Sequence, residues 1–264
     1  MMKKFGIILK AAAVVAVFML IKFSIHAGGG EFIVANPVLT ALVTGVIFTI
    51  AIIFSGILSD YKESEKIPGE LAASLRSLYN DVNFIQAKDK KKTDDLRTHI
   101  KDLLQVMLAN FEDNCWRLSK VIPSLNHIAD DVNDLAKDGV APPFIIKMRN
   151  ELTTIDRISY RIEIIMETSF IHAAYQIAMI ATAALLAVRL FTKTDHWYDA
   201  SLLLGSVTFV LISLLLLIRD MDNPFEYGGG SSADVDLSIL FKLKNELEID
   251  NRYDSHLLNR DGDT

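Results

Sequence analysis

The apolar stretch 38–58 contains the residues of the sequence that best suit a functional site. Four of its side chains recur every four residues: Thr40, Thr44, Phe48 and Ile52. An α-helix places residues at this spacing on one face. Hydroxyls that lead to an aromatic and then an aliphatic side chain suit a narrow, weakly hydrated constriction, which can gate by dewetting. The spacing therefore predicts a pore-lining face, while a packing role for small and hydroxyl residues stays open.

Residue patterns typical of enzymes are absent from the sequence. The chain lacks a GxSxG elbow, a Walker A loop, a GxGxxG turn and an HExxH helix. His99 and His127 have no second His or Cys four residues further on to complete a metal site, so we expect ordinary polar roles for both. Cys115 is the only cysteine, which excludes an internal disulfide. We therefore expect no catalytic activity, no cofactor and no metal centre.

Four long apolar blocks are the elements that would position the candidate face. The 264 residues are 51% hydrophobic and 23% charged, and nearly all charges lie outside these blocks. A hydrocarbon core of about 30 Å needs roughly 20 residues of helix, and each block approaches or reaches that length. The blocks are Phe5–Ile25, Val38–Leu58, Phe170–Val188 and Ala200–Ile218. We predict that all four span a lipid bilayer.

The first block is the one that charges interrupt, at Lys10 and Lys22. Both lysines lie near an end of the block, where a long side chain can snorkel to the headgroups. The alternative is a cleaved signal peptide. Ile25 disfavours it, because that position before a cleavage site after Ala27 favours small residues.

The distribution of Lys and Arg predicts the orientation. The segments 1–4 and 62–161 are rich in Lys and Arg, whereas the connection 26–36 has neither. Cytoplasmic segments carry this excess, so we expect both termini and the central segment inside the cell, in a multi-pass protein of the inner (plasma) membrane. The net charge of −6 argues against a general nucleic-acid partner.

The predicted organisation is all-α, with two transmembrane hairpins on either side of a long helical insert. The boundaries are 1–60 for the first hairpin, 61–168 for the cytoplasmic helical domain, 169–220 for the second hairpin and 221–264 for a cytoplasmic C-terminal tail. Within the insert, a helix over 94–121 is expected to end or kink at Pro123, because proline lacks the amide donor of a helix interior.

Three further helix boundaries follow from the insert and the tail. A helix that begins at Ser124 should stop at Gly139, a usual C-terminal residue. From Phe144 the helical pattern continues into the third span without a Gly or Pro. Asp236 is placed to cap a last helix over 237–249, beyond which the polar tail is expected to fray.

One motif resembles that of a known family. Asp222-Asn223-Pro224-Phe225, just after the last span, is similar to the Asn-Pro-Phe signature of bestrophins and bacterial bestrophin-like proteins. The link 60–68 after the second span also resembles theirs, and so does the order of two spans, helical insert, two spans and tail.

The resemblance implies a homopentameric channel for anions such as chloride, in which the second helix of each copy lines a hydrophobic neck. With the Tyr61 link in register, Thr40, Thr44 and Phe48 occupy neck-like positions. Two of these are threonine where the family favours apolar side chains. Glu226-Tyr227 follows Phe225 in place of an acidic run, so we expect no calcium clasp.

Two functions are consistent with these sequence features. The first is an oligomeric ion channel with permeant anions and the lipid bilayer as its partners. The second is a non-conducting membrane scaffold or signal-transmitting protein whose cytoplasmic helices bind a partner. An ion-coupled transporter is disfavoured, because the four spans hold no Asp, Glu or Arg near their middle.

Overall fold

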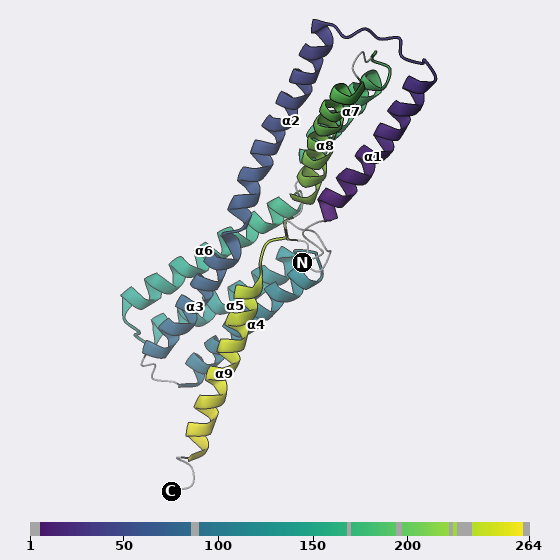
Figure 1. Ribbon diagram of the computed structural model, residues 1–264. Coiled ribbons are helices and arrows are strands. Elements are labelled where there is room, and N and C mark those ends of the chain that lie inside the picture. The colour runs from purple at the N-terminus through teal and green to yellow at the C-terminus, as the bar shows by residue number, and fades with distance from the viewer. Residues whose placement is uncertain are drawn as a thin grey trace. The chain divides into compact units, whose positions relative to one another are not determined.

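The computed structural model describes residues 6–85, 90–167, 170–193, 197–221, 224–225 and 234–260. Within these ranges the chain is α-helical apart from turns, connections and one isolated β-bridge, which confirms the predicted all-α class. The helices labelled in Figure 1 are α1 (Gly6–Ala27), α2 (Pro37–Ser64), α3 (Ile67–Phe84), α4 (Lys90–Glu112), α5 (Leu118–Lys137), α6 (Pro142–Glu167), α7 (Phe170–Leu190), α8 (Trp197–Met221) and α9 (Ser238–Arg260).

The chain forms two compact units. One contains α1, α2 as far as Tyr61, α7 and α8, and we call it the membrane unit. Its four helices are each long and apolar enough to cross a bilayer, which confirms the four predicted spans. The other, the helical unit, contains residues 62–167 and α9.

Helices α1, α7 and α8 form the closely packed part of the membrane unit. In Figure 1 they lie side by side, and α8 packs against both α1 and α7. Helix α2 joins them through an apolar cluster with side chains of α7 and α8. The buried members of this cluster are Val46, Ile50, Ile57, Ala178, Leu185, Leu211, Leu215, Ile218 and Met221.

The connections at one end of the membrane unit are hydrogen-bonded to each other. Helix α1 ends at Ala27 and is followed by a turn at Gly29, whose φ of 66° is a conformation that glycine adopts without strain. The following segment pairs with the one after α7. The amide of Ile33 donates to the carbonyl of Phe191 at 3.0 Å, and the amide of Lys193 donates to the carbonyl of Ile33 at 2.7 Å. These bonds connect the segment that precedes α2 to the segment that follows α7.

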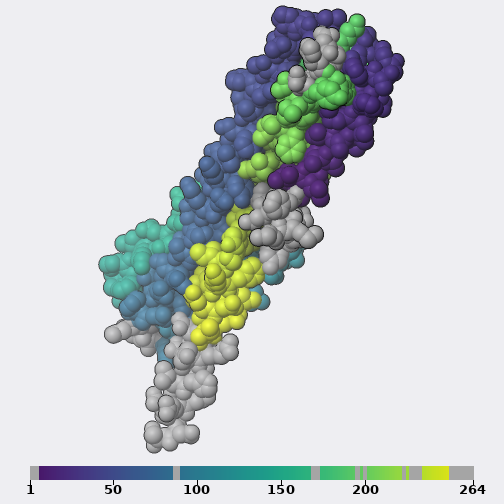
Figure 2. Space-filling view, viewed as in Figure 1, coloured from purple at the N-terminus to yellow at the C-terminus, as the bar shows by residue number. Residues whose placement is uncertain are grey.

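The helical unit is a bundle built around the apolar stripes of its helices. Helix α6 packs on α3 and α5, and α4 packs on α5. Helix α9, yellow in Figure 2, lies against α3 and α4. The stripe residues of α3 and α4 are buried: Leu71, Leu75, Leu78, Val82, Leu96, Ile100, Leu103, Leu104, Met107, Leu108 and Phe111.

The break between α4 and α5 lies at Asn114, not at Pro123 as predicted. Asn114 has φ 52°, and asparagine is among the few residues that adopt this conformation readily. The amide of Cys115 donates to the carbonyl of Asn110 at 3.1 Å, which closes α4 with a Schellman motif. Pro123 lies inside α5, where its missing donor costs one bond near the start of a helix whose apolar face is buried.

Several other predicted helix ends are confirmed, and one is wrong. Helix α5 stops before Gly139, which has φ 86°. The carboxylate of Asp236 accepts the amide of Ser238 at 2.9 Å at the start of α9. This bond also holds the pKa of Asp236 below its usual value. The helix then continues to Arg260, well beyond the predicted end at residue 249.

Candidate functional site

The four residues predicted to line a pore lie on one exposed face of α2. Thr40 and Thr44 are exposed, and the side chains of Phe48 and Ile52 are 66% and 58% exposed. The opposite face carries Ile50, which is fully buried. Figure 2 shows α2, in indigo to blue, along the margin of the membrane unit. Helix α2 thus has one face that packs inside the chain and one that the chain leaves uncovered.

The hydroxyl of Thr44 is bonded within its own helix, so it adds less polarity to the exposed face of α2 than a free hydroxyl would. Its Oγ1 donates to the carbonyl of Thr40 at 3.0 Å, within the same helix. A hydroxyl that donates to its own backbone leaves its methyl group and lone pairs outward and offers no proton to a passing ion. Threonine at this position is therefore compatible with a weakly hydrated neck.

The family-like motif after α8 is described in part. Pro224 and Phe225 are resolved, whereas Asp222 and Asn223 lie outside the described residues. Phe225 is 1% exposed, and its ring centroid lies 5.6 Å from that of Phe111 on α4. Trp116 completes this aromatic cluster at 4.8 Å from Phe111. The motif thus ends in a phenylalanine that anchors the chain in the core of the helical unit.

Sequence reasoning did not identify Trp116 as a partner of that motif. The two lie more than 100 residues apart in the chain, so no local pattern connects them. The indole nitrogen of Trp116 is buried and has no hydrogen-bond partner among the residues that the structure describes.

Lys22 does not snorkel as predicted. It is 2% exposed, and its Nζ donates to Glu31 Oε1 at 2.6 Å and to the carbonyls of Leu190 and Thr192 at 3.0 and 2.6 Å. Three acceptors satisfy the three protons of an ammonium group. The prediction failed because the acceptors come from the two connections, which only the tertiary structure brings to the lysine.

Glu31 lies at the centre of this charged group. His26 Nδ1 lies 3.1 Å from its second oxygen, and the His26 ring stacks on Trp197 at 4.5 Å. Burial raises the pKa of Glu31, but the hydrogen bonds and charges of Lys22 and His26 lower it more, so its pKa is below the usual value. Glu31 is therefore an ionised link between α1 and the connection that leads into α2.

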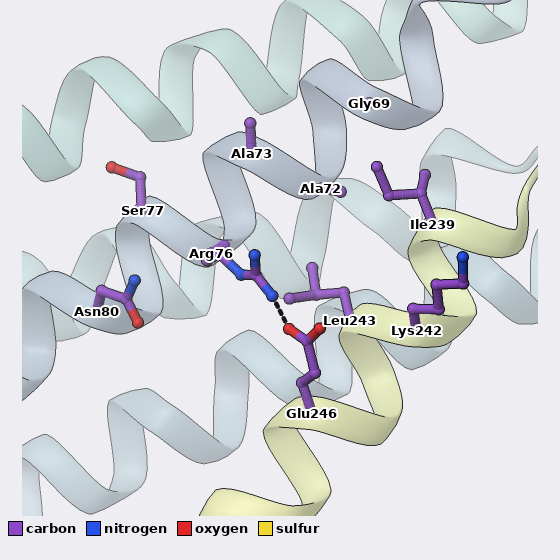
Figure 3. A pocket seen from close by; sticks show the side chains of 10 residues that line it. All are labelled: Gly69, Ala72, Ala73, Arg76, Ser77, Asn80, Ile239, Lys242, Leu243 and Glu246. Atoms are coloured by element: carbon purple, nitrogen blue, oxygen red, sulfur yellow. Dashed lines mark ion pairs between the residues drawn. The ribbon is translucent and has the colours of Figure 1, made fainter.

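A groove of about 460 Å³ lies between α3 and α9 within the helical unit (Figure 3). Arg76 and Glu246 form an ion pair across it. Both side chains are about half exposed, and exposed pairs contribute only about 0–1 kcal/mol. The buried apolar side chains of α9, Leu240, Leu243 and Leu247, are therefore its main attachment to the helical unit.

Among the residues that the structure describes, no three His, Cys, Asp or Glu side chains are placed to hold one metal ion. The exposed, uncharged face of α2 is the candidate site.

No protein-family model matches the chain, and no curated protein matches it in sequence. Solved structures do match. A bacterial Bestrophin homolog from Klebsiella pneumoniae with one substitution superposes with a TM-score of 0.73 at 12% identity, covering 93% of this chain and 97% of that one. A second structure of that homolog gives 0.72 at 12% identity over 91% and 96%. The chain has the bestrophin fold.

A further crystal structure, described as a membrane protein, gives a TM-score of 0.73 at 12% identity and covers 94% of this chain and 98% of that one. The bestrophin-like architecture predicted from the order of spans and from the motif at Phe225 is therefore confirmed as a fold. With its four candidate spans, the chain is a multi-pass membrane protein of this architecture. The fold alone does not determine the function, because one fold hosts many functions.

Proposed function

We propose that this protein is an oligomeric ion channel that conducts anions such as chloride, with α2 of each copy lining the pore. The observation that carries the proposal is the division of α2 into two faces. Ile50 and its neighbours pack against α7 and α8, whereas Thr44, Phe48 and Ile52 are uncovered in the single chain. Repeated around a symmetry axis, such an uncharged face makes a hydrophobic constriction.

The assembly that suits this face is a ring of identical copies. In a cyclic oligomer each copy presents the same surface to the axis, and the bestrophin resemblance implies five. The exposed apolar side chains of α1 and α8, such as Leu20 and Leu202, suit contact with lipid. In this proposal the protein lies in the inner (plasma) membrane, and both termini and the helical unit lie in the cytoplasm.

Preference for anions is supported by the resemblance and by the absence of acidic residues along the pore helix. No Asp or Glu occurs between Pro37 and Ser59. Rings of carboxylates favour cations, so a neck without them does not select against anions.

The test is conductance of purified full-length protein in planar bilayers under a chloride gradient. Wild type is expected to conduct, with a reversal potential displaced toward that of chloride. Phe48→Ala should raise the single-channel conductance severalfold, because it removes the largest side chain of the face. Leu202→Ala, at an equally exposed position on α8, is the matched control and should leave the conductance unchanged.

Two outcomes count against the proposal in different ways. Silence of both wild type and Phe48→Ala contradicts conduction and favours the alternative of a scaffold or signal-transmitting protein. A conductance that Phe48→Ala leaves unchanged contradicts pore lining by α2 but not conduction. Light scattering of the detergent-solubilised protein tests the ring, since five copies of 29.4 kDa predict about 147 kDa.

A further inference from the structure

Two histidines that are distant in sequence meet on the surface of the helical unit. His99 lies on α4 and His127 on α5, and their ring centroids are 5.9 Å apart with the ring planes tilted by 34°. Both rings are accessible to solvent, and the side chain of His99 is 39% exposed. The contact lies inside the helical unit, between two helices that pack along their length.

The separation of the rings suits two ligands of one metal ion. An imidazole nitrogen binds Zn²⁺ at about 2.0–2.1 Å, which puts each ring centroid roughly 3.2 Å from the ion. Two such rings at a tetrahedral angle have centroids about 5.2 Å apart. The observed separation of 5.9 Å is close to this value, and rotation of the two solvent-accessible side chains covers the difference.

Asp131 holds the imidazole ring of His99 in place. His99 Nδ1 lies 2.6 Å from Asp131 Oδ2, and an ionised carboxylate only accepts hydrogen bonds. Nδ1 is therefore the nitrogen that donates in this contact, which leaves Nε2 as the nitrogen that binds a metal in the neutral ring. A carboxylate that accepts the second N–H of a ligating histidine is the usual support of such a ligand.

Charge around the pair also favours a cation. Asp102 is three residues from His99 on α4, and Asp130 is three residues from His127 on α5, so each shares a helix face with its histidine. Lys92, one heptad before His99 on α4, forms its own ion pair with Asp138 at 2.7 Å. That pairing offsets the positive charge of Lys92.

We propose that His99 and His127 bind one divalent transition-metal ion of the Zn²⁺ type between α4 and α5, with Asp131 holding His99 in the ligating tautomer. Imidazole suits Zn²⁺, Cu²⁺ and Ni²⁺, whereas Mg²⁺ and Ca²⁺ prefer oxygen ligands. Water completes the coordination, since only two ligands come from the chain. The bound ion links α4 to α5 and stabilises the helical unit.

The experiment titrates the purified full-length protein in detergent with Zn²⁺ against a chromophoric chelator. Wild type is expected to bind one equivalent at this site with micromolar affinity. His99→Gln and His127→Gln should each abolish that equivalent. Asp131→Asn should weaken it by about 10-fold, because it removes the support of His99. Zn²⁺ should also raise the thermal midpoint of wild type but not of the histidine variants.

His26→Ala is the matched control, since His26 lies in the membrane unit and should leave this equivalent intact. Circular dichroism of each variant confirms that the helices are retained. An affinity unchanged by either histidine variant, loss in only one of the two, or no binding to wild type overturns the proposal. Conductance plays no part in this readout, so the result is independent of channel function.

Discussion

At the scale of residues, the group around Lys22 is the clearest case of a charge held away from water. The ammonium is buried, and its three acceptors come from both connections at that end of the membrane unit. Burying an ion costs several kcal/mol unless its partners replace the lost water. The group therefore stabilises the membrane unit only as long as it is complete.

Lys22→Met should lower the free energy of unfolding by about 3 kcal/mol, because it leaves the Glu31 carboxylate buried without its ammonium. Denaturant titration of the protein in detergent micelles measures the change. Lys10→Met is the control, since Lys10 is exposed on the same helix and should cost under about 1 kcal/mol. The double variant Lys22→Met/Glu31→Gln should recover part of the loss. Equal stabilities of the two lysine variants would contradict this account.

Acid should weaken the same group through Glu31. Its folded pKa lies below the usual 4.5. A lowered folded pKa adds stability that is fully present above the unfolded pKa and is lost as the pH falls through the folded value. The stability difference between wild type and Glu31→Gln should therefore be constant near neutral pH and shrink as the pH is lowered from about 4.5. Thermal melts at a series of pH values measure it, and a difference that grows in acid contradicts the prediction.

At the scale of elements, α2 has two faces with different energetic roles. In a bilayer the lipid is as apolar as an apolar side chain. The two faces of α2 therefore differ in how closely they pack, and not in removal from water. Ile50 is fully buried against other helices, and Ile52, two residues on, is 58% exposed.

Ile50→Ala should therefore destabilise the protein by about 1–3 kcal/mol through the cavity that it leaves. Ile52→Ala removes the same atoms from an uncovered position and should change the stability by under about 0.5 kcal/mol. Unfolding of the detergent-solubilised protein compares the pair. A larger effect at Ile52 than at Ile50 would mean that the inner and outer faces of α2 are assigned the wrong way round.

At the scale of the whole molecule, the bestrophin fold and the positive-inside pattern together predict that residue 115 is cytoplasmic. Cys115 is exposed and is the only thiol in the chain. A membrane-impermeant maleimide should therefore label it in inside-out vesicles and not in intact cells.

The matched control for this labelling is Val34→Cys on a Cys115→Ser background. Val34 is 64% exposed in the connection between α1 and α2, which the same rule places outside. It should be labelled in intact cells. Labelling of both thiols from the same side contradicts the orientation.

The sequence predicts the fold well because the forces that decide its elements are local. The four spans follow from uncharged runs that match the bilayer, and the bundle follows from apolar residues at helical spacing. The error at Pro123 has the same local origin. Proline is a strong sequence signal, but Asn114 ends the helix with a conformation whose sequence signal is weak.

Local sequence patterns account for the set of helices, their apolar faces and the candidate face of α2. Helical periodicity places Thr44 and Phe48 together, whatever surrounds them. Only the folded chain shows which contacts those helices make. These include the hydrogen-bond partners of Lys22, the packing of Phe225 on Phe111 and the contact of His99 with His127. Each joins segments distant in the chain, and only packing brings such segments within reach of a hydrogen bond or a shared ion.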